Sequence, residues 1–305
     1  MKSAMIFFVF SFNRGPFLRN CVASIEHCAP DAEIVIFDDR SDDQDTVEAL
    51  RRIGERHRVV SSANCGGHRH GGLYSNMQSA LEMVDGDRLI CFIQDDTQLV
   101  RMLDGEDHRF IADCFARNPD LGFISPSFIR GSQLRDDTLD VFDDSATTLF
   151  SLRNEKRSVG TYYSDIFLST SGRLRARGWV FQPGEPANQA RAKSMFSAMG
   201  YMRRPFVMWL PYGTAYRGKK KTLALRLAER ARRCGFYPFQ YMTDDQVCAL
   251  TEQPLSELPV AERFLATREP GLKKPWIYNP LQGSRVLKQL NQAELLLNRL
   301  LKRQE

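Results

Sequence analysis

Four apolar runs of strand length alternate with amphipathic helical segments in the first hundred residues, and this pattern limits the possible folds more than any other feature. The runs are Met5–Phe12, Glu33–Phe37, Arg58–Ser61 and Arg88–Gln94. Strands that are apolar along their whole length are buried on both faces, as in parallel sheets covered by helices. We therefore expect an α/β fold with a parallel sheet in this part of the chain.

The segments between these runs carry helix signals. Pro16 suits the first turn of a helix after the first run, and Ser41 is a suitable N-cap for the helix after the second. The third helix, from Leu73 onward, follows a glycine-rich loop. Apolar residues recur at helical spacing in all three segments, which predicts helices packed on the sheet.

Two of the predicted strands end in pairs of acids, Asp38–Asp39 and Asp95–Asp96. In open α/β sheets, ligands bind beyond the carboxyl ends of the strands. Carboxylate oxygens suit Mg²⁺ or Mn²⁺, and such a metal neutralises the charge of a departing diphosphate. A solvated turn after each strand is the plain alternative for either pair alone.

The loop Gly66–Gly72 has four glycines in seven residues, together with Arg69 and two histidines. Glycine lets backbone approach a ligand closely, and the N-terminus of the following helix favours an anion. The loop matches no standard phosphate-binding motif, and His68 and His70 fit exposed loop positions better than metal ligation. It therefore supports a ligand site only in combination with the acid pairs.

Four blocks in this order and spacing resemble the GT-A fold of inverting family 2 glycosyltransferases. The blocks are Phe8–Arg14, Ile36–Asp43, the spaced residues Asn64, Gly72, Asn76, Ala80 and Asp85–Asp87, and Phe92–Asp96. The resemblance covers about the first hundred residues. It implies a Rossmann-like mixed sheet with helices on both faces, followed here by a helical C-terminal extension.

The resemblance also implies roles for the acids. Asp39 would contact the nucleotide base, Asp95 would lie near the ribose or the metal, and Asp96 would bind a Mn²⁺ or Mg²⁺ ion on the diphosphate. The residues expected in nucleotide binding are Phe10, Phe12, Asn13, Asp38, Asp39 and Asp95. The D-x-D motif of the family reads Gln94-Asp95-Asp96 here, which leaves open how the two aspartates share the metal.

In the second half, the family has a Glu-Asp pair ahead of a helix, and the first acid of that pair is the general base. Glu185 is the matching residue, placed to take the proton from an acceptor hydroxyl. Pro186 stands where the family has aspartate. A solvated acid in a Pro/Gly loop is an equally good interpretation of Glu185 from sequence alone.

Three further residues are weaker candidates for acceptor binding: Arg69, Trp179 and Arg191. An aromatic such as Trp179 can stack on a sugar ring, but it is more commonly part of the core. Tyr216 lies where some relatives place a metal-binding histidine, and tyrosine serves that role less well.

The formal net charge of +5 is mild and predicts no nucleic-acid partner. The positive charge is concentrated in residues 217–233, which have the pattern of a basic amphipathic helix. Such a helix fits an anionic membrane, an acidic glycan or a solvated face. The seven cysteines are scattered with no C-x-x-C pair, so we expect reduced thiols and a cytoplasmic protein, extended at most to a peripheral contact at the inner face of the membrane.

The expected organisation is a catalytic domain at 1–217, with a nucleotide-binding half at 1–100 and an acceptor-binding half at 101–217, then a mainly helical extension at 218–305. The expected activity is metal-dependent transfer of a sugar, with inversion, from a nucleoside-diphosphate donor to a glycan or lipid-linked acceptor. UDP-sugars are the favoured donors because the resemblance implies them. Two alternatives stay open: a degenerate GT-A fold that binds nucleotide sugars or acts as a scaffold, and, with less support, a sugar nucleotidyltransferase.

Overall fold

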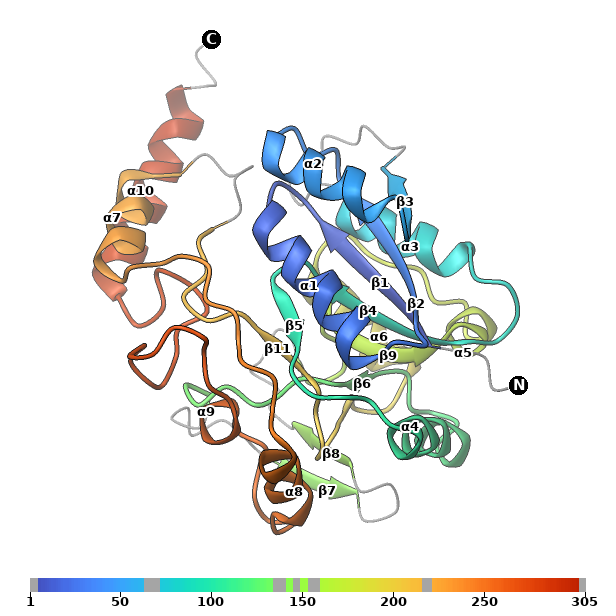
Figure 1. The fold of residues 1–305 in the computed structure, drawn as a ribbon. Helices are drawn as coiled ribbons and strands as arrows, with labels where there is room; N and C mark the ends of the chain where they lie inside the picture. The colour runs from blue at the N-terminus through green and yellow to red at the C-terminus, as the bar shows by residue number, and fades with distance from the viewer. Residues whose placement is uncertain are drawn as a thin grey trace.

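The computed structural model of the protein describes residues 5–62, 72–133, 141–144, 149–152, 160–215 and 221–301. Its centre is a mixed nine-stranded sheet with helices on both faces (Figure 1). The strands run in the order β3-β2-β1-β4-β9-β6-β10-β8-β7. Their bounds are β1 Ile6–Ser11, β2 Glu33–Asp38, β3 Arg58–Ser61, β4 Leu89–Gln94, β6 Ile124–Ser125, β7 Val141–Asp144, β8 Leu149–Leu152, β9 Phe167–Thr170 and β10 Gly200–Tyr201.

The four strands predicted from the apolar runs are present and parallel to one another. In the register of β1 with β2, Ser11 lies opposite Asp38, and in that of β1 with β4, Phe10 lies opposite Gln94. β9 is antiparallel to both β4 and β6, which makes the sheet mixed. The expected α/β fold with a mixed sheet and a helical C-terminal segment is confirmed.

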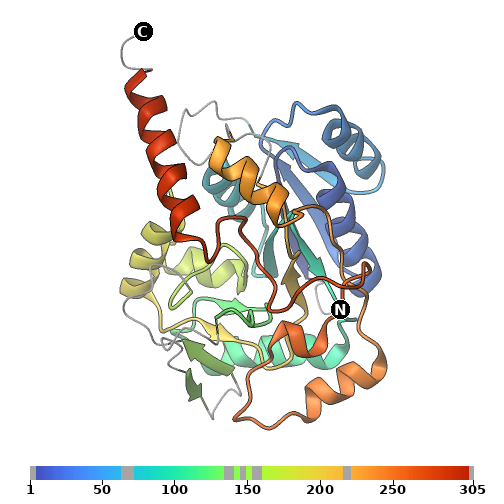
Figure 2. The ribbon, with the colours of Figure 1, turned by 90° about the vertical axis from the view of Figure 1, so that its left-hand side faces the viewer.

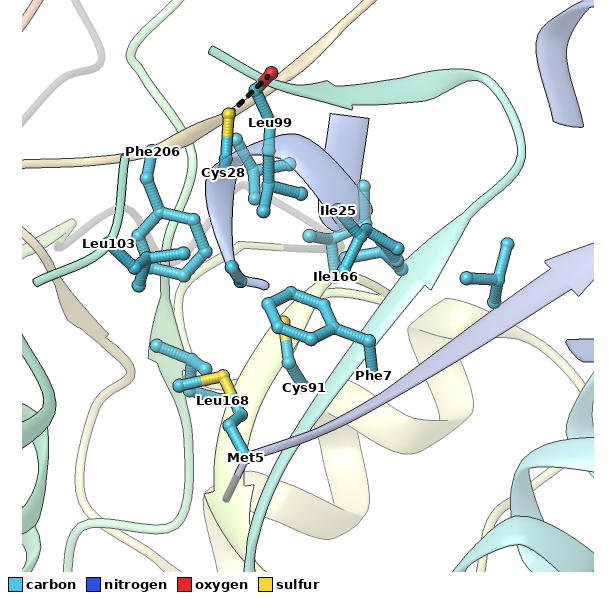
Figure 3. Packing of buried hydrophobic residues seen from close by; sticks show 14 of the residues in the cluster. Met5, Phe7, Ile25, Cys28, Cys91, Leu99, Leu103, Ile166, Leu168 and Phe206 are labelled. Atoms are coloured by element: carbon cyan, nitrogen blue, oxygen red, sulfur yellow. Dashed lines mark hydrogen bonds between the residues drawn. The ribbon is translucent and has the colours of Figure 1, made fainter. Parts of the chain in front are cut away.

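Helices cover both faces because alternate residues of the buried strands point in opposite directions. Phe7 and Val9 pack in a cluster with α1 (Gly15–Cys28), α2 (Gln44–Ile53) and α4 (Gly105–Arg117). Figure 3 shows part of this cluster, where Cys28 contacts the carbonyl of Leu99 as a small buried side chain.

The opposite face is covered by a second cluster. Phe8 and Phe10 pack there against residues of α3 (Leu73–Glu82), α5 (Ser171–Ala176) and α6 (Glu185–Met195). Phe92 of β4 stacks on Phe10 at 5.4 Å and on Phe167 at 4.7 Å between ring centroids. This continuous aromatic layer fixes the spacing of β1, β4 and β9 at the centre of the sheet.

Two local predictions differ from the structure. The N-cap of α2 is Asp43, whose side chain accepts a hydrogen bond from Thr46 N, and not Ser41. Ser41 instead binds Asp38, so it organises the turn before the helix. The expected strand at 121–128 is reduced to β6. After β6 the chain leaves the large sheet, and Ser127 and Ile129 pair with Val207 and Val260 in isolated bridges.

The C-terminal segment shares this cluster with the first part of the chain. β5 (Thr97–Leu99) and β11 (Val207–Trp209) form a small antiparallel sheet, and the amide of Gln98 makes two hydrogen bonds of 2.9 Å with the backbone of Phe239. Trp276 packs on Phe239 at 5.2 Å. The remaining helices are α7 Leu223–Ala231, α8 Asp244–Glu252, α9 Ala261–Phe264 and α10 Arg285–Leu301. The described part of the extension thus contains four helices joined by long irregular stretches. One of these stretches is hydrogen-bonded to β5 through Phe239.

A buried ion pair joins the end of β5 to α4. The guanidinium of Arg101 makes hydrogen bonds of 2.7 and 2.8 Å with the two carboxylate oxygens of Asp107, and both side chains are almost fully buried. The same guanidinium donates to the carbonyls of Arg204 and Pro205. Without the arginine, Asp107 would keep only the hydrogen bond from Asp104 N at 3.2 Å and would lose its counter-ion.

We expect Arg101→Met to lower the free energy of unfolding by about 3–5 kcal/mol, because it leaves a buried carboxylate without its counter-ion. Urea denaturation followed by circular dichroism measures this. Arg109→Met on the exposed side of α4 is the matched control and should change stability by less than about 0.5 kcal/mol. A loss below about 1 kcal/mol for Arg101→Met would show that the pair is not a structural constraint.

Candidate functional site

The two acid pairs flank the end of the same strand, β1. Asp95 N donates to Phe10 O at 3.0 Å, and Asp39 N donates to Ser11 O at 2.9 Å. The parallel register of β1 with both neighbours therefore brings Asp38–Asp39 and Asp95–Asp96 to one edge of the sheet. This is the edge where ligands bind in such folds.

Asp95 is buried and faces back toward the β1 end. Its Oδ2 accepts hydrogen bonds from Ser11 Oγ at 3.1 Å and from Phe12 N at 3.2 Å. Burial raises the pKa of Asp95 to about 7, and the charge of Arg14 opposes this effect. Asp95 thus links the acid edge to the loop that follows β1.

Arg14 also belongs to this edge, although the sequence analysis assigned it no role in the site. Its Nη1 lies 2.6 Å from Asp96 Oδ2 and 3.5 Å from Asp95 Oδ1, and its Nη2 donates to Thr214 O at 3.3 Å. The guanidinium therefore supplies positive charge at the place where the sequence predicts a metal. Arg14 lies directly before α1 and within the Phe8–Arg14 block, and this position is the sequence feature from which its role could have been predicted.

The side chains at this edge fit a divalent metal that completes its coordination with phosphate oxygens. Asp96 Oδ1 is buried and has no hydrogen-bond partner among the described residues. No group of three or more histidine, cysteine or acidic side chains suited to a metal occurs in the described ranges. Mg²⁺ commonly binds one or two carboxylates together with substrate phosphates, so Asp96, with Asp95 beside it, is a sufficient protein contribution.

Asp38 and Asp39 have different surroundings. Asp38 is buried and accepts hydrogen bonds from Ser41 N at 2.8 Å and from Ser41 Oγ at 2.6 Å; burial raises its pKa. Asp39 is half-buried, and its Oδ2 accepts a hydrogen bond from Gly72 N at 2.7 Å. Asp38 therefore shapes the turn, while Asp39 is the acid at this strand end that is more open to a ligand.

Asn13 connects the loops after β1 and β2. Its side-chain oxygen accepts from Asp42 N at 2.9 Å and Asp43 N at 3.2 Å, and its amide donates to Asp42 Oδ1 at 2.6 Å. Its φ of 51° is in the left-handed region, which asparagine tolerates better than most residues. Asn13 acts on the site by holding these two loops together.

Gly72 allows Asp39 to take its position. A Cβ atom at Gly72 would lie 2.3 Å from Asp39 Oδ1 and 2.8 Å from Ser62 Oγ. A side chain at position 72 would therefore make the Asp39 carboxylate and the Ser62 hydroxyl move.

A cavity of about 250 Å³ opens beside the acid edge. Its lining includes Gln94, directly before the acid pair, and Glu185 on the far side. Its other lining residues are Ser125, Ser127, Phe128, Ile129, Arg130, Gln133, Gly160, Ser164, Asp165, Ile166, Tyr201 and Trp209. The cavity thus brings Glu185 together with the residue directly before the acid pair.

Glu185 is the first residue of α6, so its charge is favoured by the helix N-terminus. Gly184 before it has φ of 113°, a conformation open to glycine and strained for other residues. Pro186 occupies the first turn, where proline is well tolerated, which explains locally how it replaces the aspartate of the family. Burial raises the pKa of Glu185, opposed by a hydrogen bond from Asp165 N at 3.2 Å.

Arg130 is the positive residue of the cavity. Its guanidinium lies over the rings of Trp209 at 4.1 Å and Tyr278 at 4.7 Å from their centroids. Within the described part of the chain, no carboxylate lies within 4 Å of it and its Nε has no hydrogen-bond partner. The aromatic rings hold this cation in place; burial lowers the pKa of Arg130, and nearby Tyr278, Asp96 and Glu185 oppose this effect.

Several predicted site residues lie elsewhere. Trp179 is 2% exposed, stacks with core aromatics and does not line the cavity, so the structure contradicts its assignment to acceptor binding. Arg191 donates to Gly178 O at 2.9 Å and is also absent from the lining, which gives it a role in holding that turn. The ring of Phe10 is in the core, so only its backbone is at the site. Arg69 lies outside the described residues.

Comparison with known proteins decides the family of the first third of the chain. The family model described as glycosyl transferase family 2 matches residues 7–103, which span β1 to the segment after β5. This match agrees with the family resemblance that the sequence blocks of the first hundred residues carry. No curated protein matches the sequence.

Solved structures with a similar fold include three glycosyltransferases. S. aureus TarS, residues 1–349, is 14% identical, covers 67% of this chain and is covered over 60% of its own length, with a TM-score of 0.47. A mannosyltransferase of Pyrobaculum calidifontis solved with GDP-Man and Mn²⁺ is 14% identical, with coverage of 76% and 62% and a TM-score of 0.44. The glucosyl-3-phosphoglycerate synthase of Mycobacterium tuberculosis solved with Mn²⁺ and UDP-glucose is 17% identical, with coverage of 79% and 84% and a TM-score of 0.43. The chain thus spans less than two thirds of the length of the first two.

We expect Gly72→Ala to weaken the binding of nucleoside diphosphates by about ten- to a hundredfold, because it displaces Asp39 and removes a charge-assisted hydrogen bond. Isothermal titration calorimetry measures the affinity. Gly105→Ala at the start of α4 is the matched control, since its Cβ would meet nothing closer than 3.5 Å. Equal affinity in both variants would exclude Asp39 from the nucleotide site.

Proposed function

We propose that this glycosyltransferase moves a sugar, with inversion, from a nucleoside-diphosphate donor to a hydroxyl of a glycan or lipid-linked acceptor. UDP-sugars are the favoured donors. The observation that carries the proposal is the cavity that runs from Gln94, next to the acid pair, to the carboxylate of Glu185. It provides a donor position and an acceptor position on either side of the bond that would be exchanged.

Each residue has a role in this reaction. Asp39 would recognise the nucleotide, with the loops after β1 and β2 held by Asn13. Asp96, assisted by Asp95, would hold Mn²⁺ or Mg²⁺, which when bound stabilises the charge of the departing diphosphate. Glu185 would accept the proton of the acceptor hydroxyl as its oxygen attacks the anomeric carbon in line with the leaving group. Arg130 and Arg14 add positive charge on the diphosphate side of the cavity.

A thermal-shift panel of nucleoside diphosphates and nucleotide sugars, with and without Mn²⁺, tests the donor and the metal together. We expect UDP or a UDP-sugar with Mn²⁺ to raise the melting temperature by several degrees at about 100 times Kd, where binding adds ~2.7 kcal/mol. In Asp96→Asn the Mn²⁺-dependent part of the shift should disappear. Asp113→Asn, an exposed acid of α4, should leave it unchanged.

The same panel separates the alternatives. A Mn²⁺-dependent shift without hydrolysis or transfer of any donor would favour a degenerate fold that only binds nucleotide sugars. Release of pyrophosphate from a nucleoside triphosphate and a sugar phosphate would show a nucleotidyltransferase. An unchanged metal-dependent shift in Asp96→Asn would refute the proposed metal site.

We further propose that the helices α7 and α10 form a contact surface for an anionic membrane. The helix within the basic segment spans Leu223–Ala231, shorter than the expected 217–233, and residues 216–220 lie outside the described part. The two helices lie side by side at the edge of the molecule (Figures 1 and 2). Glu294 of α10 accepts hydrogen bonds from the backbone of Leu223 and Ala224, which fixes α10 at the N-terminus of α7.

This helix pair exposes apolar and basic side chains together. Its exposed large apolar residues are Leu223, Leu227, Val286, Leu290, Leu295, Leu296 and Leu297. Its exposed cations in the described part are Arg226, Arg230, Arg285 and Lys288. The acids of the two helices are both engaged, Glu229 with Lys221 and Glu294 with the N-terminus of α7. Exposed leucines beside unopposed cations match an interfacial helix on anionic lipid. No helix among the described residues is long and apolar enough to cross a bilayer.

We expect the full chain to sediment with vesicles containing about 30% phosphatidylglycerol and much less with neutral phosphatidylcholine vesicles, because each surface cation contributes about 1 kcal/mol on an anionic surface. Leu290→Ser with Leu297→Ser should reduce binding at least tenfold. Leu255→Ser, equally exposed but distant in the fold, is the control. Equal sedimentation with both vesicle types, or no effect of the double variant, would exclude this surface.

A further inference from the structure

Two acidic residues from separate segments line the same cavity and are joined by a backbone hydrogen bond. Glu185 begins α6, and Asp165 lies just before β9. The backbone N–H of Asp165 donates to Glu185 Oε1 at 3.2 Å, and both residues line the cavity. Nothing in the sequence pattern singled out Asp165, because it is an isolated acid twenty residues before Glu185.

The groups that face this pair come from three directions. From α3, Tyr74 donates its hydroxyl to Asp165 Oδ2 at 3.1 Å. Tyr163, on the same segment as Asp165, is fully buried beside it. Arg130 is the one cation among the described residues that line the cavity, and its charge acts on Glu185. The tyrosine hydroxyls can donate hydrogen bonds, but they cannot neutralise two carboxylates.

Two adjacent carboxyl groups in a desolvated site cannot both ionise at neutral pH without a large electrostatic cost. Burial raises the pKa of Asp165 to about 8, and the charge of Glu185 adds to this effect. Burial also raises the pKa of Glu185, but the hydrogen bond from Asp165 N and the charge of Arg130 oppose it. Asp165 is therefore the member of the pair that keeps its proton.

We propose that Asp165 and Glu185 form a coupled carboxyl pair with one proton, in which protonated Asp165 is the positioning residue and ionised Glu185 faces the acceptor hydroxyl. The inference rests on the proposed function and adds a residue to it. Asp165 supplies, from a different segment, a second carboxyl group in the cavity that Glu185 lines. A single negative charge in the cavity, beside Arg130, also repels the diphosphate of the donor less than a doubly ionised pair would.

The proton and electron movements balance. The acceptor O–H bond breaks, and its proton goes to the Glu185 carboxylate. The oxygen forms a bond to the anomeric carbon, whose bond to the diphosphate oxygen breaks, and that electron pair leaves with the nucleoside diphosphate. The pair then holds two protons and no net charge, a favourable state for buried carboxyl groups, and returns one proton to water when the products leave.

The pair can be tested first without any substrate. Carbon-13 NMR of the full chain labelled at its aspartate carboxyls should show one group that titrates near pH 8. This signal should be absent in Asp165→Asn and should titrate at lower pH in Glu185→Gln, because the neighbouring charge is gone. Asp113→Asn, an exposed acid of α4, should leave it unchanged. An Asp165 signal that titrates near pH 4, or one insensitive to Glu185→Gln, would overturn the pair.

Kinetics on the donor identified by the nucleotide panel then test the role. In the wild-type protein, kcat/KM should fall above about pH 8, as a second negative charge enters the cavity; Asp165→Asn should lack this fall. Glu185→Gln should lower kcat by about 10²–10⁴-fold at every pH. A wild-type profile that keeps its alkaline fall in Asp165→Asn would overturn the positioning role.

The two proposals fail in different ways. Absence of nucleotide binding in the panel would overturn the proposed function. A normal titration of Asp165 with intact nucleotide binding would overturn only the carboxyl pair.

Discussion

The parallel pairing of β1 with β2 and β4 is the constraint on which the rest of the site depends. It sets Ser11 opposite Asp38 and Phe10 opposite Gln94, so that two acid pairs more than fifty residues apart in sequence end at one edge. The pairing itself is fixed by the aromatic layer on one face and by α1 and α2 on the other. A slip of one residue would turn each strand's side chains to the opposite face, so the core and the site are specified together.

Each acid at this edge has a different hydrogen-bond or ion-pair partner. Asp38 is satisfied by Ser41, Asp39 by the backbone of Gly72, and Asp96 by Arg14. Asp165 and Glu185 in the cavity form no ion pair among the described residues. In our proposal, a shared proton takes the role of the missing counter-ion. Arg14 pairs with Asp96 at the strand end, and Arg130 lines the cavity together with Asp165 and Glu185. In our proposal, both arginines add positive charge where the anionic leaving group departs.

Much of the fold was predictable because its signals are local. Fully apolar runs such as Ile6–Ser11 and Leu89–Gln94 identify buried parallel strands, and the acids that follow them fall at the carboxyl ends by the geometry of the sheet alone. Local competition explains the errors. Ser41 has the chemistry of an N-cap, but the buried carboxylate of Asp38 binds it and Asp43 takes over the cap. Trp179 has the chemistry of a sugar platform, but the aromatic core between β9 and α6 buries it.

The sequence by itself determined the class of fold and the edge that carries the acids, because both depend on residues close together in the chain; for Glu185 it left a solvated acid as an equal alternative. Only the tertiary structure decided which side chains meet at that edge. Arg14 reaches Asp96 across about eighty residues, and Asp165 bonds Glu185 although β9 and α5 lie between them in the sequence. Such contacts depend on packing distances and on the desolvation of charged groups, which arise only when the whole chain has folded.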